Sequence, residues 1–97
     1  MNRTKYGDAD CPDKVFNLAK HTKDKDPMEF REDAYGNIMK KSEYGKQTEF
    51  GWVIDHIIPT SRGGSDDIKN LQALNWRKNI QLGGKLKKKS RHSKINK

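Results

Sequence analysis

The sequence predicts a small α+β domain, and three observations support this class. First, a chain of 97 residues is long enough for one compact domain and no more. Second, short apolar runs at 51–58 and 71–74 have the length of strands, whereas residues 10–21 and 76–82 follow helix-capping residues. Third, only 31% of the residues are hydrophobic and 35% are charged, so the core must be thin.

The N-terminal part is predicted to supply a helix. Residues 1–9 are polar and we expect them to be flexible. A cap at Asp10 or Cys11, with Pro12 in the first turn, starts a helix that we expect to end near His21. His21 has no carboxylate or cysteine at ligand spacing, so we interpret it as exposed rather than metal-binding.

A hairpin is predicted next, because the segments 28–31 and 37–40 flank the turn signal Tyr35-Gly36-Asn37. Arg31 and Asp33 allow two interpretations. As a surface pair they contribute little stability, whereas near a functional site Arg31 is suited to hold a phosphate group. We favour a structural role for Asp33 and leave both roles open for Arg31.

The chemistry concentrates at Asp55-His56, which interrupts an apolar run. Burying these side chains is unfavourable unless they are paired or bind a metal. They are either a satisfied histidine beside a loop-capping aspartate or a His-carboxylate pair for metal-assisted hydrolysis. Successive strand residues point to opposite faces, so the strand must end or distort here if both face one site. Pro59 and the glycine-rich loop after it support such an ending.

The C-terminal half is predicted to add a strand and a helix. Residues 71–74 are expected to pair antiparallel with the strand that begins at Gly51. Asn75 is expected to cap a short helix over 76–82, which places Asn79 one turn into that helix. Gly63-Gly64 is interpreted as a turn, because two glycines alone are a weak signal for a phosphate-binding loop.

His56 precedes Asn70 by 14 positions, and Asn70 precedes Asn79 by 9. Asp55, Pro59, Gly63-Gly64 and Asn70-Leu71-Gln72 stand in register with them. This pattern resembles the HNH endonuclease family, in its Asp-His, Asn, Asn form. The resemblance covers 51–82 closely and 28–50 more weakly. It implies the ββα-metal fold, in which two strands and a helix bring Asp55, His56 and Asn79 together.

The resemblance also implies a metal-dependent endonuclease that hydrolyses DNA phosphodiester bonds. An imidazole with an ordinary pKa of about 6.5 suits His56 as the general base, and Asp55 and Asn79 are expected to bind one divalent cation. Two oxygen ligands favour Mg²⁺, with Mn²⁺ as a substitute. The family assigns Asn70 a supporting role in the catalytic site, tying the loop so that His56 is aimed correctly.

Two departures from the family pattern affect these expectations. Many members bind a structural zinc through two Cys-x-x-Cys pairs, but this chain has a single cysteine, Cys11, and carries Asn75 and Lys78 at the second pair. We therefore expect no structural zinc and no internal disulfide. Members often have a lysine three residues after the last motif residue, where this chain has Leu82. Lys78 and Lys85 are the candidates to supply that charge.

The net charge of +8 lies almost entirely in residues 85–97, which contain seven basic and no acidic residues. We expect this tail to be disordered and interpret it as an arm for nucleic-acid phosphates, with a solubilising tail or a nuclear-import signal as alternatives. The predicted nucleic-acid contacts are Arg31, Arg62, Arg77, Lys78, Lys85, Lys87, Lys88 and Lys89.

Together these features predict one HNH nuclease domain over 10–84, followed by the tail. The expected partner is DNA, most simply duplex, bound by a monomer. No apolar run has the length of a membrane span or forms a signal peptide, so we expect a soluble, intracellular protein with no membrane partner. Two alternatives remain: a non-catalytic nucleic-acid-binding module on the same scaffold, and RNA as the substrate.

The predicted core contains the larger apolar residues of these elements. They are Val15, Phe16, Leu18, Phe50, Trp52, Ile54, Ile57, Leu71, Leu74, Trp76 and Ile80.

Overall fold

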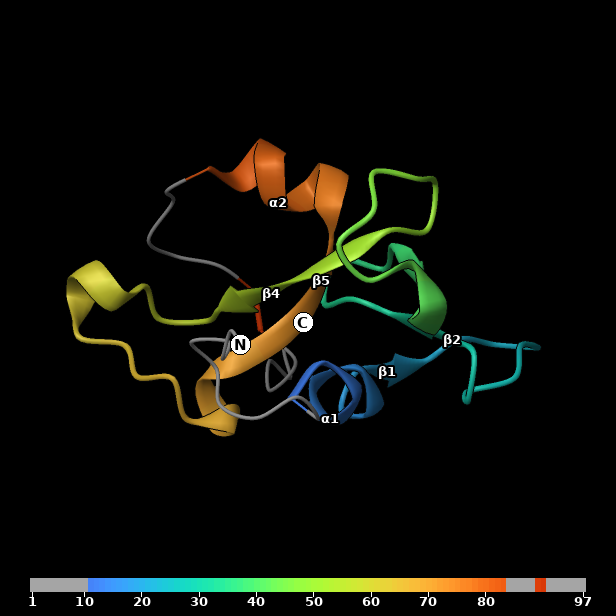
Figure 1. Ribbon diagram of the computed structural model, residues 1–97, viewed down its shortest axis with the longest axis horizontal. Helices are drawn as coiled ribbons and strands as arrows, with labels where there is room; N and C mark the ends of the chain where they lie inside the picture. Colours follow the sequence, from blue (N-terminus) through green and yellow to red (C-terminus); the bar gives the residue numbers. More distant parts are fainter. Residues whose placement is uncertain (1–10, 84–88, 91–97) are drawn as a thin grey trace, which may run out of the picture.

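The computed structural model describes residues 11–83 and 89–90. Within them, two small antiparallel sheets and two short α-helices form an α+β fold, as predicted (Figure 1). The elements are α1 (Cys11–Asn17), β1 (Lys20–His21), β2 (Phe30–Glu32), β3 (Ile38–Lys40), β4 (Trp52–His56), β5 (Leu71–Asn75) and α2 (Trp76–Leu82), with 3₁₀ turns η1 (Lys41–Glu43), η2 (Thr60–Arg62) and η3 (Ile68–Asn70). The flexible segment predicted at 1–9 and most of the predicted tail lie outside the described residues. Neither described α-helix has the length and apolar composition of a membrane span.

The sheet formed by β4 and β5 is the centre of the fold. The strands pair antiparallel from Trp52 opposite Asn75 to His56 opposite Leu71. Figure 1 shows α2 over one face of this sheet and α1 over the other. Because both faces are covered, every residue of β5 is buried, including its polar residues Gln72 and Asn75. The predicted unit of two strands and a helix is therefore present.

The second sheet has the order β1-β2-β3. The predicted hairpin is confirmed, because Arg31 lies opposite Met39 across β2 and β3. The prediction for the first helix was wrong at its C-terminal end: α1 ends at Asn17, and Lys20–His21 form an edge strand instead. The physical reason is competition from β2, because Lys20 and His21 pair with that strand.

Asp33 joins the hairpin to the start of α2. Its Oδ1 accepts hydrogen bonds from the backbone N–H groups of Tyr35 (3.0 Å) and Asn37 (2.9 Å), which fixes the turn between β2 and β3. Its Oδ2 accepts the backbone N–H of Asn75 (3.0 Å), 42 positions along the chain. Asp33 is only 1% exposed, so these bonds satisfy a buried carboxylate, in agreement with the structural role favoured from the sequence.

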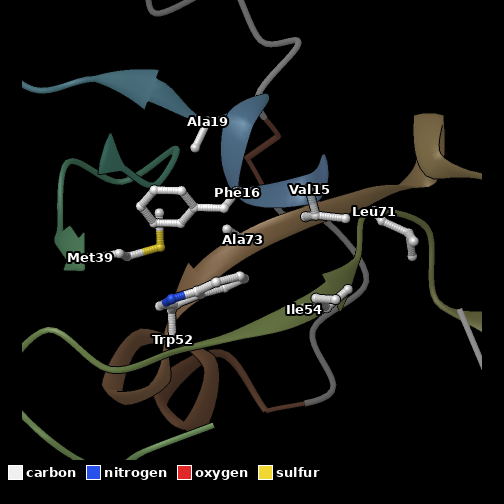
Figure 2. Close-up of a cluster of buried hydrophobic side chains, with 8 residues drawn as sticks. All are labelled: Val15, Phe16, Ala19, Met39, Trp52, Ile54, Leu71 and Ala73. Atoms are coloured by element: carbon white, nitrogen blue, oxygen red, sulfur yellow. The ribbon is translucent and has the colours of Figure 1, made fainter. Parts of the chain in front are cut away.

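The core lies between α1, β3, β4 and β5 (Figure 2). The ring centroids of Phe16 and Trp52 are 5.1 Å apart at its centre. The cluster comprises Val15, Phe16, Ala19, Met39, Trp52, Ile54, Leu71 and Ala73. Leu74 is also fully buried. Six of the predicted core residues are thus confirmed, whereas Met39 and the two alanines were not predicted.

The remaining core predictions were wrong to different degrees. Leu18 is 44% exposed because it lies beyond the end of α1, and Ile80 is 63% exposed because α2 contributes no buried residue. Phe50, Ile57 and Trp76 are half-buried. The indole N–H of Trp76 donates to the backbone oxygen of Thr48 (2.6 Å), so this ring is held at the surface of the domain rather than in its core.

Candidate active site

Asp55, His56 and Asn79 line one cleft of about 340 Å³. Asp55 and His56 are the last two residues of β4, and Asn79 lies in the middle of α2. The side chain of His56 is 13% exposed, and Asp55 is 8% exposed. The strand ends directly after His56, where the chain turns into the loop at 57–70. Pro59 and the η2 residues Thr60 and Ser61 also line this cleft.

Asn75 fixes the start of α2 and thereby the position of Asn79. Its Oδ1 accepts the backbone N–H of Arg77 (3.0 Å), the helix cap that the sequence predicted. Its Nδ2 also donates to the backbone oxygens of Ile38 (3.2 Å) and Glu49 (3.3 Å). The cap residue therefore connects α2 to β3 and to the segment before β4, which the sequence did not indicate.

Asn70 holds the loop at 57–70 closed. Its Oδ1 accepts the backbone N–H of Ile58 (2.8 Å), and its Nδ2 donates to the backbone oxygens of Ile58 (3.0 Å) and Ser65 (2.8 Å). The Asn70 backbone oxygen accepts the N–H of Ile57 (2.8 Å). One side chain thus ties both ends and the middle of the loop that follows His56.

Glycine is required at the two positions of this loop for different structural reasons. Gly63 has φ +89°, a left-handed conformation that L side chains rarely adopt. Gly64 allows a close approach, because a Cβ there would lie 1.7 Å from the backbone oxygen of Ile58 and 2.9 Å from Asn70 Nδ2. These contacts agree with the interpretation of Gly63-Gly64 as a turn.

Sequence reasoning missed Asp66, which contacts His56 directly. The Asp66 Oδ1 lies 2.7 Å from His56 Nε2, and the Asp66 side chain is 50% exposed. The sequence did not indicate which acidic residue would contact His56, because both Asp66 and Asp67 follow the glycines. The second, Asp67, has a different role: its side chain caps η3 by accepting the backbone N–H of Lys69 (3.0 Å).

The donor set of the cleft suits a hard divalent cation. Asp55 offers carboxylate oxygens and Asn79 an amide oxygen, which are ligands that Mg²⁺ prefers. Asp55 and Asn79 would supply few protein ligands to such a cation, as Mg²⁺ sites commonly do. Within residues 11–83 and 89–90, no group of three or more His, Cys, Asp or Glu side chains is arranged to hold a metal.

The predicted nucleic-acid contacts fall in different environments. Arg62 and Arg77 are exposed, and Lys78 is half-buried. The Arg77 guanidinium lies 5.5 Å from the centroid of the Trp76 ring, and the Lys78 Nζ lies 5.1 Å from that of Tyr35. These cations are therefore held over aromatic rings along α2.

Two further predicted contacts differ from expectation. Arg31 is only 8% exposed, and its guanidinium donates to three backbone oxygens of the same domain. Arg31 is therefore not the surface partner of Asp33 considered from the sequence, and its bonds to backbone oxygens favour a different structural role. In the predicted tail, the Lys89 N–H donates to Tyr35 Oη (2.9 Å) and the Lys89 oxygen accepts from Gln72 Nε2 (3.0 Å). Lys85, Lys87 and Lys88 lie outside the described residues.

The two strands, the helix and the shared cleft correspond to the ββα arrangement expected from the sequence. In comparisons with known proteins, residues 43–83 match the model of the family described as HNH endonuclease. This match agrees with the resemblance that the motif predicted. The matched segment contains Asp55, His56, Asn70 and Asn79.

One similar protein is described as probable mobile endonuclease C, from Enterobacteria phage T4. It is 41% identical over 46 residues, which cover 44% of this chain and 22% of that protein. The chain thus matches less than a quarter of this relative's length. No solved structure gives a significant match.

Proposed function

We propose that this protein is a divalent-metal-dependent endonuclease that hydrolyses phosphodiester bonds of DNA. The observation that carries the proposal is the single cleft shared by Asp55, His56 and Asn79. These residues combine a carboxylate, an imidazole and an amide at the end of a strand and the middle of a helix. The HNH match over 43–83 supports the general class of nuclease.

In this proposal His56 is the general base. It takes a proton from a water molecule, whose oxygen attacks the phosphorus in line with the leaving oxygen. The phosphorus–oxygen bond to the leaving group then breaks, and a proton from solvent neutralises the leaving oxygen. Asn70 supports this step indirectly, because its bonds to Ile58 and Ser65 hold the loop that follows His56.

Asp55 and Asn79 would hold the metal through their side-chain oxygens. A bound Mg²⁺ supplies Lewis-acid stabilisation of the charge that develops on the phosphate and the leaving oxygen. The oxygen donors favour Mg²⁺, and Mn²⁺ is expected to substitute because it accepts similar ligands.

Substrate binding is assigned to basic residues near the cleft and in the C-terminal tail. Arg62 follows the cleft residues Thr60 and Ser61 in η2, while Arg77 and Lys78 lie on the same helix as Asn79. With Lys85, Lys87, Lys88 and Lys89, they would bind the phosphates of duplex DNA. Such contacts position a protein on a polymer without reading its sequence, so we expect weak sequence preference from a monomer.

The test is cleavage of supercoiled plasmid by the wild type, His56→Ala and His21→Ala, with Mg²⁺, Mn²⁺ or EDTA. His21 is exposed on β1 and serves as the matched histidine control. We expect nicking or cutting by the wild type and His21→Ala in either metal, none in EDTA, and a loss of roughly 100-fold or more in His56→Ala.

Two results would contradict the proposal. If the wild type retards the plasmid in a gel but cleaves it in neither metal, the chain is a binding module without activity. If a structured RNA of equal length is cut faster than DNA under the same conditions, the substrate assignment is wrong while the mechanism stands.

A further inference from the structure

We propose that Asp66 positions His56 by accepting a hydrogen bond from its Nε2–H, which fixes the ring tautomer in which Nδ1 takes the proton from water. This inference rests on the proposed function, because it names the residue that prepares the base. Asp66 is a positioning residue: its carboxylate acts through the imidazole and is not assigned any contact with the substrate.

The geometry is that of a strong hydrogen bond. The Asp66 Oδ1 and His56 Nε2 atoms are 2.7 Å apart, at the short end of the range for bonds to ionised groups. In a neutral imidazole one nitrogen carries the proton and the other the lone pair. A carboxylate can only accept, so a neutral ring beside it carries its proton on Nε2 and its lone pair on Nδ1.

The residues on both sides of Asp66 are held in place. Before it, the Ser65 backbone oxygen accepts a hydrogen bond from Asn70 Nδ2 (2.8 Å). After it, the Asp67 backbone N–H donates to Ser65 Oγ (3.2 Å) and the Asp67 side chain caps η3. Asn70 is itself bonded to Ile58, two positions after His56. The same bonds therefore set the path of the chain at both partners of the pair.

Exposure favours an orienting role over a stabilising one. The Asp66 side chain is 50% exposed, whereas that of His56 is 13% exposed. Solvent screens a pair with such an exposed partner, and it adds little to the stability of the fold. Its main effect is to restrict the rotation and tautomer of a ring at the edge of the cleft, as hydrogen-bonded partners of catalytic histidines do.

The kinetic test compares Asp66→Ala, Asp66→Asn and Asp67→Asn in the full chain. Asp67→Asn is the matched control, because it removes the same charge one residue away and asparagine still caps a helix well. We expect kcat to fall roughly 10- to 100-fold in Asp66→Ala and less in Asp66→Asn, which keeps an accepting oxygen. In both Asp66 variants we expect the KM, and the DNA affinity measured in EDTA, to equal those of Asp67→Asn.

The second readout does not depend on cleavage. Nitrogen NMR of the histidine rings, at about pH 8 where an ordinary imidazole is neutral, reports which nitrogen carries the proton. The His56 signals are assigned by their loss in His56→Ala. We expect only the Nε2–H tautomer in the wild type and Asp67→Asn, and a mixture of tautomers in Asp66→Ala.

These two readouts separate the inference from the proposed function. A wild type that does not cleave DNA defeats the proposed function, whereas the tautomer experiment still decides the contact of Asp66. A proton on Nδ1 in the wild type, or an unchanged tautomer and unchanged kcat in Asp66→Ala, would overturn the role of Asp66. An unchanged tautomer in Asp66→Ala, together with a higher Mg²⁺ concentration needed for cleavage, would also overturn this role. That result would make Asp66 a metal ligand.

Discussion

The Arg31 guanidinium donates to three backbone carbonyl groups, which favours a structural role over a phosphate contact. Its Nε bonds the oxygen of Pro27 (2.8 Å), and its Nη1 bonds those of Asn17 (2.7 Å) and Ala19 (3.1 Å). The last two oxygens lie at and just beyond the end of α1, where backbone acceptors lack partners within the helix. Arg31 therefore caps α1 and joins it to β2.

Replacing Arg31 is predicted to affect stability, whereas replacing Arg62 should affect DNA binding. In Arg31→Met the three carbonyl groups lose their donor, which we expect to lower the free energy of unfolding by about 2–4 kcal/mol. In Arg62→Met the free energy should stay within about 0.5 kcal/mol, because exposed substitutions cost little. Urea unfolding of both variants measures this difference.

The matching DNA measurement is the dependence of affinity on salt concentration. Loss of one phosphate contact makes the slope of log affinity against log salt less negative by about 0.9. We expect this change in Arg62→Met and not in Arg31→Met at a temperature where both are folded. The reverse pattern would return Arg31 to the nucleic-acid interface.

Among single residues, the sequence predicted those whose position follows from their immediate neighbours in the chain. Asp55 and His56 stood out as ionisable residues in an apolar run, and the cap at Asn75 fixed the register of Asn79. The partner of His56 was not predictable, because Asp66 and Asp67 are chemically identical and only the path of the loop separates them. The burial of Arg31 likewise depends on carbonyl groups up to 14 positions away.

The loop between β4 and β5 is the element that controls the surroundings of His56. Its ends are joined by Asn70 and Ile58, and Gly64 packs against the same two residues. A side chain at Gly64 would push on the Ile58 backbone, which cannot yield as a flexible side chain would. The loop therefore depends on Gly64 more than on Gly63, where a Cβ would meet nothing within 4 Å.

Gly64→Ala is predicted to reduce cleavage far more than Gly63→Ala. The first breaks the contacts of Asn70 and displaces the loop that carries Asp66, so we expect kcat to fall roughly 10- to 100-fold. The second costs about 1–2 kcal/mol of backbone strain in a left-handed position, with the loop path retained. Initial rates on plasmid and limited proteolysis within 57–70 measure the two effects. Equal rates in the two variants would contradict this account of Gly64.

Elements with strong local signals were predicted well, and elements that depend on pairing were not. The central strands, the hairpin and α2 followed from apolar runs, the turn at Gly36 and the cap at Asn75. The end of α1 and the strand β1 were missed, because Lys20 and His21 carry no strand signal and pair only through the backbone of β2. For the same reason the exposure of Leu18 was not foreseen.

The whole molecule has two distinct sides, because α1 and α2 cover opposite faces of the β4–β5 sheet (Figure 1). Asn79, Arg77 and Lys78 belong to the α2 side. Lys89 also lies near this side, since its Nζ is 5.8 Å from the ring of Tyr35, over which Lys78 Nζ also lies. DNA bound at the cleft would therefore meet the side of the molecule on which Lys78 and Lys89 lie.

This arrangement predicts that lysines of the tail and lysines of the α1 side contribute differently to DNA affinity. Replacing Lys85, Lys87 and Lys88 with glutamine should make the salt slope less negative by about 2–3. Replacing the exposed Lys14, Lys20 and Lys23 removes the same charge on α1, β1 and the segment after them, and should change the slope by less than about 1. Lys89 stays in both variants because its backbone bonds Tyr35 and Gln72.

The comparison separates local contact from net charge. Long-range attraction depends on the total charge, so its loss would weaken DNA binding equally in both triple variants. The salt slope instead depends on the number of counterions released, which reports how many phosphates the protein contacts. Fluorescence anisotropy of a labelled duplex at several salt concentrations, in EDTA to prevent cleavage, gives both slopes. Equal slopes in the two variants would mean that the tail acts only through its charge. A larger change in the α1-side variant would place the DNA on the opposite face from the cleft, and would contradict the proposed binding mode.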